Sequence, residues 1–419
     1  HGGAAGRMTL LAREVSVCRV CRSILGPHFL DLGNQTLANN LCSGDYNGHY
    51  AGEDPRAPLR LVRCEHCSLV QLTHVVDPVV LFSHYLYTPS QSGTFRRHFR
   101  DLAQAVTQRR GRGIAFDIGS NDGLLLSYFK TLSWTVAGID PAKNLAEQTN
   151  RAGIPTLCDF WNHKTAQRMV DEFGEPDVIT ATNVFAHNDD VHEFIAAAKS
   201  VLRPGGEFII EVPYLPIMLR DGTFDLCYSE HRSYFSLLPI VRLMEEHGLE
   251  VCRAEIVPIH GGSLRFSARA PNGHQDHVGV HELLESEKRE GLDSAAPYER
   301  FAHRAAVIHD ALVDLVRGEA AQGRVVGYGA PAKATVLVNY CGFTPRDIEY
   351  IVDDNPLKQG LYLPGSHIPI RKSSALDRAP PRAVIIFPWN LADEISQKLP
   401  AGVTVIVPLP HPRVLNVRG

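Results

Sequence analysis

Short apolar runs that alternate with longer amphipathic stretches dominate the chain from about residue 113 onward. The runs at 113–119, 134–140, 177–182 and 206–212 have the length and apolar content of buried strands. The stretches that separate them are long enough for helices. Strands that alternate with helices predict a parallel sheet covered by helices on both faces.

The same alternation returns near the carboxyl end of the chain. A polar stretch at about 278–320 has a helical pattern and predicts a connection or hinge. Four further apolar runs then follow, at 324–329, 348–353, 383–387 and 403–407. They predict a second α/β unit that is separate from the first.

Composition and charge exclude several classes of function. The chain has 419 residues, of which 44% are hydrophobic and 21% charged, with a formal net charge of −4. This is the composition of a globular protein with two or three domains and no basic surface for nucleic acid. There is no apolar run long enough to span a bilayer and no secretory pattern, so we expect no membrane partner and a cytoplasmic location.

Cysteines near the amino terminus form two CxxC pairs. The chain has nine cysteines, an odd number that argues against a disulfide framework. Each CxxC turn directs two thiolates toward one ion, and two such turns complete a tetrahedral sulfur site suited to structural zinc. The expected ligands are Cys18, Cys21, Cys64 and Cys67. The 42 residues between the pairs predict an inserted subdomain, and two unrelated pairs of buried or redox-active thiols are the alternative.

A glycine loop after the first strand predicts a nucleotide-like cofactor. The loop reads Asp117-x-Gly-x-x-x-Gly123, which differs from the GxGxxG of dinucleotide sites. The stretch 202–206, Leu-Arg-Pro-Gly-Gly, is typical of methyltransferases, so we expect S-adenosylmethionine. By that analogy Asp117 and Gly119 line the methionine end, Asp140 holds the ribose, and Asp159 and Phe160 flank the adenine. The full set of expected cofactor-binding residues is Asp117, Gly119, Asn121, Asp140, Asp159, Phe160 and Asn183.

Taken together, the motifs resemble one family, the sugar C-methyltransferases of antibiotic deoxysugar pathways. The likeness runs from about residue 18 to 410. The matching segments are 18–21, 64–78, 117–123, 183–187, 228–231, 233–236, 260–265, 327–333 and 352–360. Three positions depart from the family pattern: Asp117 stands where Glu is common, 188–190 reads Asn-Asp-Asp, and Arg232 stands where Leu is frequent.

The resemblance implies an α/β fold with three parts and a defined reaction. The parts are a small N-terminal zinc-binding domain, a Rossmann-like class I methyltransferase core and a C-terminal Rossmann-like domain. The implied substrate is a dTDP-linked 4-keto-6-deoxy or 2,6-dideoxyhexose, methylated on C3, with C5 as the alternative. The residues implied in catalysis are Tyr228, Glu230, His231 and His187, with either Tyr85 or Tyr87.

Carbon methylation beside a ketone needs a base, a group that stabilises the enolate oxygen, and a methyl donor in line with the carbon. His231 is neutral near pH 7 and can accept the proton, with His187 or Tyr228 as rival bases. Tyr228 can donate to the oxyanion or relay the proton. Glu230 can orient one of these groups or contact the sugar.

Three more residues are expected to bind substrate. His260 and Arg265 lie near the end of the predicted core, where they contact the substrate or merely satisfy a turn. Lys333 follows a glycine-containing loop that opens a helix, which suits a phosphate. A solvent-facing lysine in a structural domain is the alternative.

These observations divide the chain into five segments. We expect a tag or disordered tail at 1–12, a zinc-binding domain at 13–80, a methyltransferase core at 81–275, a helical linker at 276–320 and a substrate-binding domain at 321–419. The partner is then a nucleotide sugar, and the chain is a monomer or weak homo-oligomer. Competing hypotheses are an NAD-dependent oxidoreductase built on the two Rossmann-like units and a zinc-dependent scaffold without activity.

Overall fold

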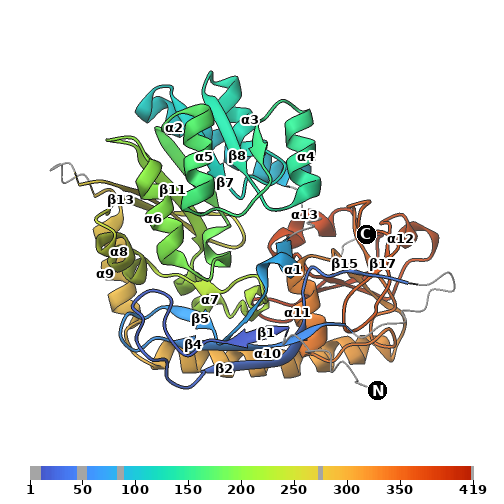
Figure 1. The fold of residues 1–419 in the computed structure, drawn as a ribbon. Coiled ribbons are helices and arrows are strands. Elements are labelled where there is room, and N and C mark those ends of the chain that lie inside the picture. Colours follow the sequence, from blue (N-terminus) through green and yellow to red (C-terminus); the bar gives the residue numbers. More distant parts are fainter. Residues whose placement is uncertain (1–10, 45–53, 83–88, 272–276, 417–419) are drawn as a thin grey trace, which may run out of the picture.

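The computed structural model describes residues 11–44, 54–82, 89–271 and 277–416 (Figure 1). Two α/β units lie beside each other, and an N-terminal module lies below the core and beside the C-terminal unit in this view. In the described ranges no helix is long and apolar enough to cross a membrane.

A seven-stranded sheet forms the first α/β unit, in the order β13-β14-β11-β10-β7-β8-β9. The strands β9-β8-β7-β10-β11 are parallel, and β14 pairs antiparallel with both β11 and β13. Their bounds are β7 Ile114–Ile118, β8 Thr135–Ile139, β9 Thr156–Leu157, β10 Val178–Thr182, β11 Glu207–Pro213, β13 Glu250–Val257 and β14 Ser263–Arg269. The four strands predicted from apolar runs are confirmed.

Helices cover both faces of this sheet, as the alternation predicted. One face packs against α2 (Gly93–Arg110) and α3 (Leu124–Thr131), and its core includes Phe99 and Phe129. The other face packs against α5 (His163–Phe173) and α6 (Val191–Val201). The remaining helices of the unit are α4 Lys143–Arg151, α7 Leu215–Asp221 and α8 Leu237–Glu246.

The C-terminal unit is a six-stranded sheet in the order β18-β16-β15-β19-β20-β21. All neighbouring strands are parallel except β20 and β21. The bounds are β15 Val325–Tyr328, β16 Ile351–Val352, β18 Ile370–Arg371, β19 Ala383–Ile386, β20 Thr404–Val407 and β21 Arg413–Asn416, with helices α11 Ala332–Tyr340, α12 Ala375–Arg378 and α13 Ala392–Ser396. The predicted second α/β unit is confirmed.

The N-terminal module is tied to both units by shared strands. Its sheet has the order β12-β5-β4-β2, with β2 Leu30–Thr36, β4 Arg56–Arg63, β5 Val70–Leu72 and β12 Ser233–Tyr234. Because β12 comes from the core, the module and the core share one sheet. In addition, β3 (Cys42–Ser43) pairs with β17 (Leu361–Tyr362) of the C-terminal unit.

The amino-terminal edge of the module begins earlier than expected. Ala12, which we assigned to the tail, is the first residue of β1 (Ala12–Glu14). This strand pairs antiparallel with β6 (His74–Val76), which is followed by α1 (Pro78–Phe82). Residues 1–10 lie outside the described ranges.

The stretch expected as a linker forms two helices that both pack on their neighbours. In α9 (Val280–Glu290), the buried Glu287 accepts hydrogen bonds from the hydroxyl of Tyr214 and from the backbone N–H of Leu237. The 25-residue α10 (Ala296–Ala320) runs along the lower side of the molecule (Figure 1) and contacts α7 and β15. Helix α10 therefore connects the two α/β units, whereas α9 packs on β13 and α8 of the core.

Candidate active site

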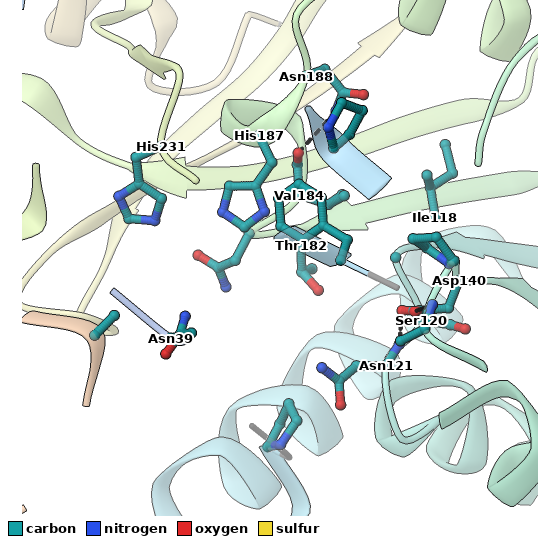
Figure 2. A pocket seen from close by; sticks show the side chains of 18 of the residues that line it. Asn39, Ile118, Ser120, Asn121, Asp140, Thr182, Val184, His187, Asn188 and His231 are labelled. Atoms are coloured by element: carbon teal, nitrogen blue, oxygen red, sulfur yellow. Dashed lines mark hydrogen bonds between the residues drawn. The ribbon is translucent and has the colours of Figure 1, made fainter. Parts of the chain in front are cut away.

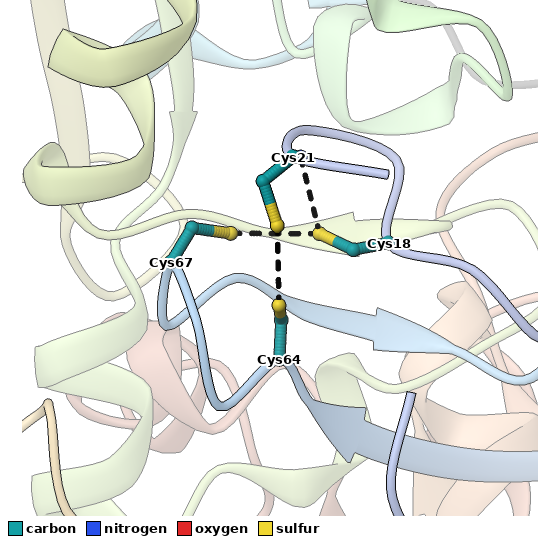
Figure 3. A group of neighbouring side chains, drawn as sticks. All are labelled: Cys18, Cys21, Cys64 and Cys67. Carbon is teal, nitrogen blue, oxygen red and sulfur yellow. Dashed lines mark hydrogen bonds between the residues drawn. The ribbon is translucent and has the colours of Figure 1, made fainter. Parts of the chain in front are cut away.

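Four cysteine sulfur atoms of the N-terminal module point toward one centre (Figure 3). The distance is 3.5 Å between the Sγ atoms of Cys18 and Cys67 and 3.4 Å between those of Cys21 and Cys64, and all four sulfurs lie within 4.8 Å of one another. A zinc ion with Zn–S bonds of about 2.3 Å places its four sulfurs about 3.8 Å apart. The donor set and its spacing therefore fit structural zinc.

Both cysteine pairs adopt the same backbone turn. Arg22 N–H donates to the carbonyl of Cys18 at 3.0 Å, and Ser68 N–H donates to the carbonyl of Cys64 at 2.9 Å. Arg22 and Ser68 both have positive φ, 60° and 63°. This left-handed residue closes each turn and brings the two thiols of a pair to the same side.

A cavity of about 470 Å³ lies where the core, the N-terminal module and the C-terminal unit meet. Figure 2 shows Ser120, Asn121 and Asp140 on one side of it and His187 and His231 on the other. All seven residues expected to bind cofactor are in its wall, namely Asp117, Gly119, Asn121, Asp140, Asp159, Phe160 and Asn183.

The loop after β7 is shaped for close approach of a ligand. Gly119 has φ of +67°, and a Cβ there would lie 2.8 Å from the side chain of Val184, so the loop requires glycine. Asp117 is buried, accepts a hydrogen bond of 2.6 Å from the hydroxyl of Thr180, and has its pKa raised to about 7 by burial. Asp140, at the end of β8, accepts from the backbone N–H of Asn121 at 2.9 Å.

Asn183 marks where a ligand would complete the cavity wall. Its backbone is left-handed, with φ of 58°, and its N–H donates to the carbonyl of Glu211 at 2.8 Å. Its side-chain Oδ1 is buried and has no hydrogen-bond partner in the described part of the chain. A buried acceptor of this kind is costly unless a donor meets it. The ammonium group of S-adenosylmethionine is such a donor, so the wall fits the cofactor that the sequence predicted.

Tyr228 and His231 form a hydrogen-bonded pair in the cavity wall. His231 Nδ1 lies 2.8 Å from the carbonyl oxygen of Leu226, and because a carbonyl only accepts, Nδ1 carries the hydrogen. The neutral ring then presents a lone pair at Nε2, which accepts the hydroxyl hydrogen of Tyr228 at 2.8 Å. Burial lowers the pKa of His231 to about 3, so the ring is neutral at physiological pH.

His187 lies against His231. It ends the short helix η2 (Phe185–His187) just beyond β10, and the two imidazole rings stack with centroids 5.2 Å apart. Burial, and then the positive charge that His231 would carry, lower the pKa of His187 well below its ordinary value. The site thus holds two neutral imidazoles side by side.

Glu230 lies behind the cavity wall and binds a residue that sequence reasoning missed. Its buried carboxylate accepts two hydrogen bonds from Asn39 Nδ2, at 2.7 and 2.9 Å. Asn39 itself lines the cavity (Figure 2). It belongs to the insert between the cysteine pairs, where no spacing rule connects it to a glutamate 191 positions away.

The three expected substrate-binding residues have different positions. His260 lines the cavity, and burial lowers its pKa to about 4. Arg265, on β14, instead forms ion pairs with the two neighbouring strands, at 3.0 Å from Glu211 on β11 and 3.3 Å from Glu255 on β13. Tyr85 and Tyr87, expected at the active site, lie outside the described residues.

Lys333 reaches the cavity from the start of α11. Its Nζ donates to Asn390 Oδ1 at 2.7 Å and lies 4.3 Å above the ring of Trp389. Burial lowers the Lys333 pKa to about 8, although the carboxylate of Asp225 opposes that shift. A cation held against an aromatic ring at a cavity edge is suited to an anionic group.

Trp389 and Asp225 join the two α/β units beside the cavity and were missed from the sequence. Trp389, in η4 (Trp389–Leu391), donates from Nε1 to the buried Asp225 Oδ2 at 2.7 Å. Its ring also packs on Gly261, where a Cβ would lie 3.0 Å from the ring. Gly261 therefore makes room for a ring from the other unit.

Family models match three consecutive parts of the chain. Residues 18–82 match a model described as "Putative zinc binding domain", residues 91–254 match a methyltransferase domain, and residues 258–410 match a C-methyltransferase C-terminal domain. The last boundary separates β13 from β14, although both strands belong to the core sheet.

Relatives match over very different lengths. The C-methyltransferase NovU of Streptomyces niveus is 35% identical over 418 residues, which cover 98% of this chain and 99% of that protein. A ubiquinone biosynthesis O-methyltransferase of Rhodopseudomonas palustris is 33% identical over 95 residues, 22% of this chain and 37% of that one.

Among solved structures, the glycopeptide N-methyltransferase MtfA, complexed with S-adenosyl-L-methionine, is 13% identical with a TM-score of 0.33 and covers 41% of this chain and 94% of that one. Magnesium protoporphyrin IX methyltransferase of Synechocystis is 12% identical with a TM-score of 0.33, and covers 42% and 79%. The full-length match to NovU and the three family models carry the assignment. The chain belongs to the family of S-adenosylmethionine-dependent C-methyltransferases.

Proposed function

We propose that the enzyme methylates a carbon beside the 4-keto group of a dTDP-linked 4-keto-6-deoxy or 2,6-dideoxyhexose. The observation that carries this proposal is the pairing of Tyr228 with a neutral His231 in the same cavity as the cofactor-facing loop. Methyl transfer to oxygen or nitrogen needs no enolate, whereas transfer to carbon requires a base for a C–H proton. A buried base in the cavity that would hold the methyl donor supports carbon as the acceptor.

The base acts through the hydroxyl of Tyr228. In the ground state this hydroxyl donates its hydrogen to His231 Nε2. As the phenol oxygen takes the carbon proton, its own proton passes to Nε2. The electron pair of the C–H bond becomes the enolate, and His231 becomes the imidazolium, which later releases the proton to water.

His187 is suited to stabilise the enolate oxygen. A neutral imidazole donates a hydrogen bond without becoming a competing acid, and burial keeps His187 neutral. Asp117, Gly119 and Asn183 would hold S-adenosylmethionine, which would supply an electrophilic methyl group to the enolate carbon and leave as S-adenosylhomocysteine. Asn39 lines the wall beside these groups, fixed by Glu230, and is placed to orient a sugar hydroxyl.

The C-terminal unit is proposed to hold the nucleotide diphosphate. Lys333 and Lys358 both line the cavity, and Lys333 is the second residue of α11, where backbone N–H groups favour an anion. The Lys358 amine is buried, donates to the carbonyl of Ala330 at 2.8 Å, and lies 3.9 Å from Asp353. Two cations at one end of the cavity support a diphosphate rather than a neutral acceptor.

Several finer expectations stay proposals. The site of methylation is C3, with C5 as the alternative, because both carbons flank the C4 ketone. The division at residues 13–80, 81–275, 276–320 and 321–419, a cytoplasmic location and a monomeric or weakly associated state also stay predictions.

Proton exchange tests the proposal without requiring methyl transfer. The enzyme is incubated in deuterated water with S-adenosylhomocysteine and a dTDP-4-keto-6-deoxyhexose, and NMR follows loss of the proton signals on C3 and C5. We expect enzyme-dependent exchange at one of these two carbons. No exchange above the enzyme-free rate, with any of the candidate sugars, would refute enolate formation.

A further inference from the structure

The first cysteine pair encloses an arginine that faces the protein interior. Arg19 lies between Cys18 and Cys21 and is only 6% exposed. Burial lowers the pKa of its guanidinium, while the carboxylate of Asp189 opposes that shift. An arginine is seldom buried unless it is paired and hydrogen-bonded, so its partners indicate its role.

The Arg19 guanidinium contacts the chain next to both active-site histidines. Its Nη1 donates to the carbonyl of Arg232 at 3.1 Å and to that of Leu72 at 3.2 Å, and its Nε donates to Asp189 Oδ1 at 3.1 Å. Arg232 directly follows His231, and Asp189 is two residues beyond His187. One side chain therefore holds the two segments that carry the imidazole rings.

The backbone around these contacts is fixed from both sides. The carbonyl of Arg232 also accepts from the N–H of Leu72 at 3.0 Å, and the N–H of Arg232 donates to the carbonyl of Ala186 at 2.9 Å. Ala186 is the residue before His187. The backbone of Arg232 thus links the segments that carry His187 and His231 to each other and to β5 of the N-terminal module.

The residue after Arg19 also contacts the core. The carbonyl of Val20 accepts a hydrogen bond of 2.8 Å from His192 Nε2, near the start of α6. Both residues between the first two cysteines therefore hold the methyltransferase core, whereas the cysteines themselves form the metal site. Asp189 and Arg232 both depart from the family pattern, and Arg19 donates hydrogen bonds to both of them.

We propose that Arg19 is a positioning residue: it couples the geometry of the metal-binding turn to the placement of His187 and His231. This inference rests on the proposed roles of those histidines. Stacked rings 5.2 Å apart and a 2.8 Å bond to Tyr228 define the reacting geometry. A shift of about 1 Å in such a geometry costs about 100-fold in rate.

Three variants distinguish this positioning role from an effect of charge near Asp189 and from an effect on protein stability. Arg19→Met removes all side-chain hydrogen bonds of Arg19 but keeps much of its volume. Arg19→Lys keeps the charge beside Asp189 but cannot reach two carbonyls and a carboxylate at once. Arg13→Gln is the matched control, because Arg13 pairs with the same Asp189 yet is 64% exposed and contacts neither carbonyl.

Four measurements are made on each variant: bound zinc by metal analysis, cofactor affinity by calorimetry, kcat and KM of methyl transfer, and histidine reactivity. Reactivity is the rate at which diethyl pyrocarbonate modifies His187 and His231, read by peptide mass spectrometry. That rate needs no substrate. In the parent protein, hydrogen bonds to Leu226 and Tyr228 occupy both nitrogens of His231, so its modification is slow.

We expect Arg19→Met to bind one zinc and the cofactor normally, to lose about 30- to 100-fold in kcat with KM changed less than about threefold, and to react faster at His231. Arg19→Lys falls between this variant and the parent, and Arg13→Gln matches the parent. Native kcat and native histidine reactivity in Arg19→Met would overturn the proposal. Equal losses in Arg19→Met and Arg13→Gln would also overturn it, because they would assign the effect to the charge near Asp189.

A folding failure or a wrong substrate class does not leave the inference untested. If Arg19→Met loses zinc or cofactor binding, Arg19→Lys decides: intermediate kcat supports the proposal, and parental kcat with parental histidine reactivity refutes it. If the parent enzyme turns over no keto-sugar, the proposed function fails. Histidine reactivity still tests the role of Arg19, and a modification rate in Arg19→Met that is unchanged at both rings would refute its positioning role.

Discussion

Replacing Tyr228 by phenylalanine removes a single oxygen atom from the cavity wall. The ring of Tyr228 packs on His231 with centroids 4.0 Å apart, and its hydroxyl donates to Nε2 at 2.8 Å. Phenylalanine keeps the ring and its packing. The substitution therefore breaks the proton path to His231 while leaving the imidazole in place.

The size of the effect follows from the role of that hydrogen. Proton transfer by a positioned group contributes about 10²- to 10⁴-fold to a rate, which corresponds to about 3–5 kcal/mol of transition-state stabilisation. A hydrogen bond in the ground state contributes only about 1 kcal/mol to folding. We therefore expect kcat to fall at least about 100-fold in Tyr228→Phe, with a small change in stability.

Two rates and a control variant test this. Formation of S-adenosylhomocysteine reports methyl transfer, and deuterium exchange beside the ketone reports proton removal. Both should fall together in Tyr228→Phe, while calorimetric affinity for S-adenosylmethionine stays within about twofold. Tyr234→Phe is the matched control, because the Tyr234 ring meets His231 edge-on at 6.2 Å. Exchange and transfer rates within about threefold of the parent in Tyr228→Phe would refute the relay.

Three further predictions concern other parts of the site. Asn39→Ala removes both hydrogen bonds to Glu230 and should lower kcat about tenfold, which steady-state kinetics measures against an unchanged cofactor affinity. The Lys333 pKa is lowered to about 8, so the cation is present below that pH and lost above it. Acceptor KM should therefore rise above pH 8. Lys333→Arg should abolish this rise because arginine does not titrate there. A rise that persists in this variant would show that Lys333 is not the group whose titration weakens acceptor binding. Cys64→Ser should lose bound zinc and lower the melting temperature, since binding to a structural metal site contributes folding free energy; full zinc content would contradict a four-sulfur site.

Much of the fold could be predicted because it is encoded locally. The four strands predicted in the core are short, mostly apolar runs, and several turns that need a left-handed residue have a glycine, as at Gly119. Arg22, Ser68 and Asn183 adopt the same backbone conformation without this signal. The cysteine pairs are similarly local, because two thiols three positions apart already fix a turn. The two turns are separated by 42 residues, and the prediction that they share one ion required only that both supply thiolates.

Contacts between distant segments could not be predicted in this way. Glu230 was expected in catalysis, but no pattern in the sequence indicates that Asn39 holds it from the insert between the cysteine pairs. Trp389 and Asp225 meet across 164 positions, and the only local trace is the glycine that accommodates the ring. Arg265 had the right residue type for a substrate contact, yet its position on β14 directs it toward Glu211.

We propose that Tyr228 and His231 deprotonate the carbon that then receives the methyl group. The most direct measurement is NMR of the product formed from S-adenosylmethionine bearing a ¹³C-methyl group and dTDP-4-keto-6-deoxy or 2,6-dideoxy sugars. We expect a ¹³C-methyl signal whose protons show two- and three-bond correlations to a carbon beside the ketone, C3 or C5, and to the C4 carbonyl. A label on oxygen or nitrogen, or on a carbon that does not flank the ketone, would contradict it.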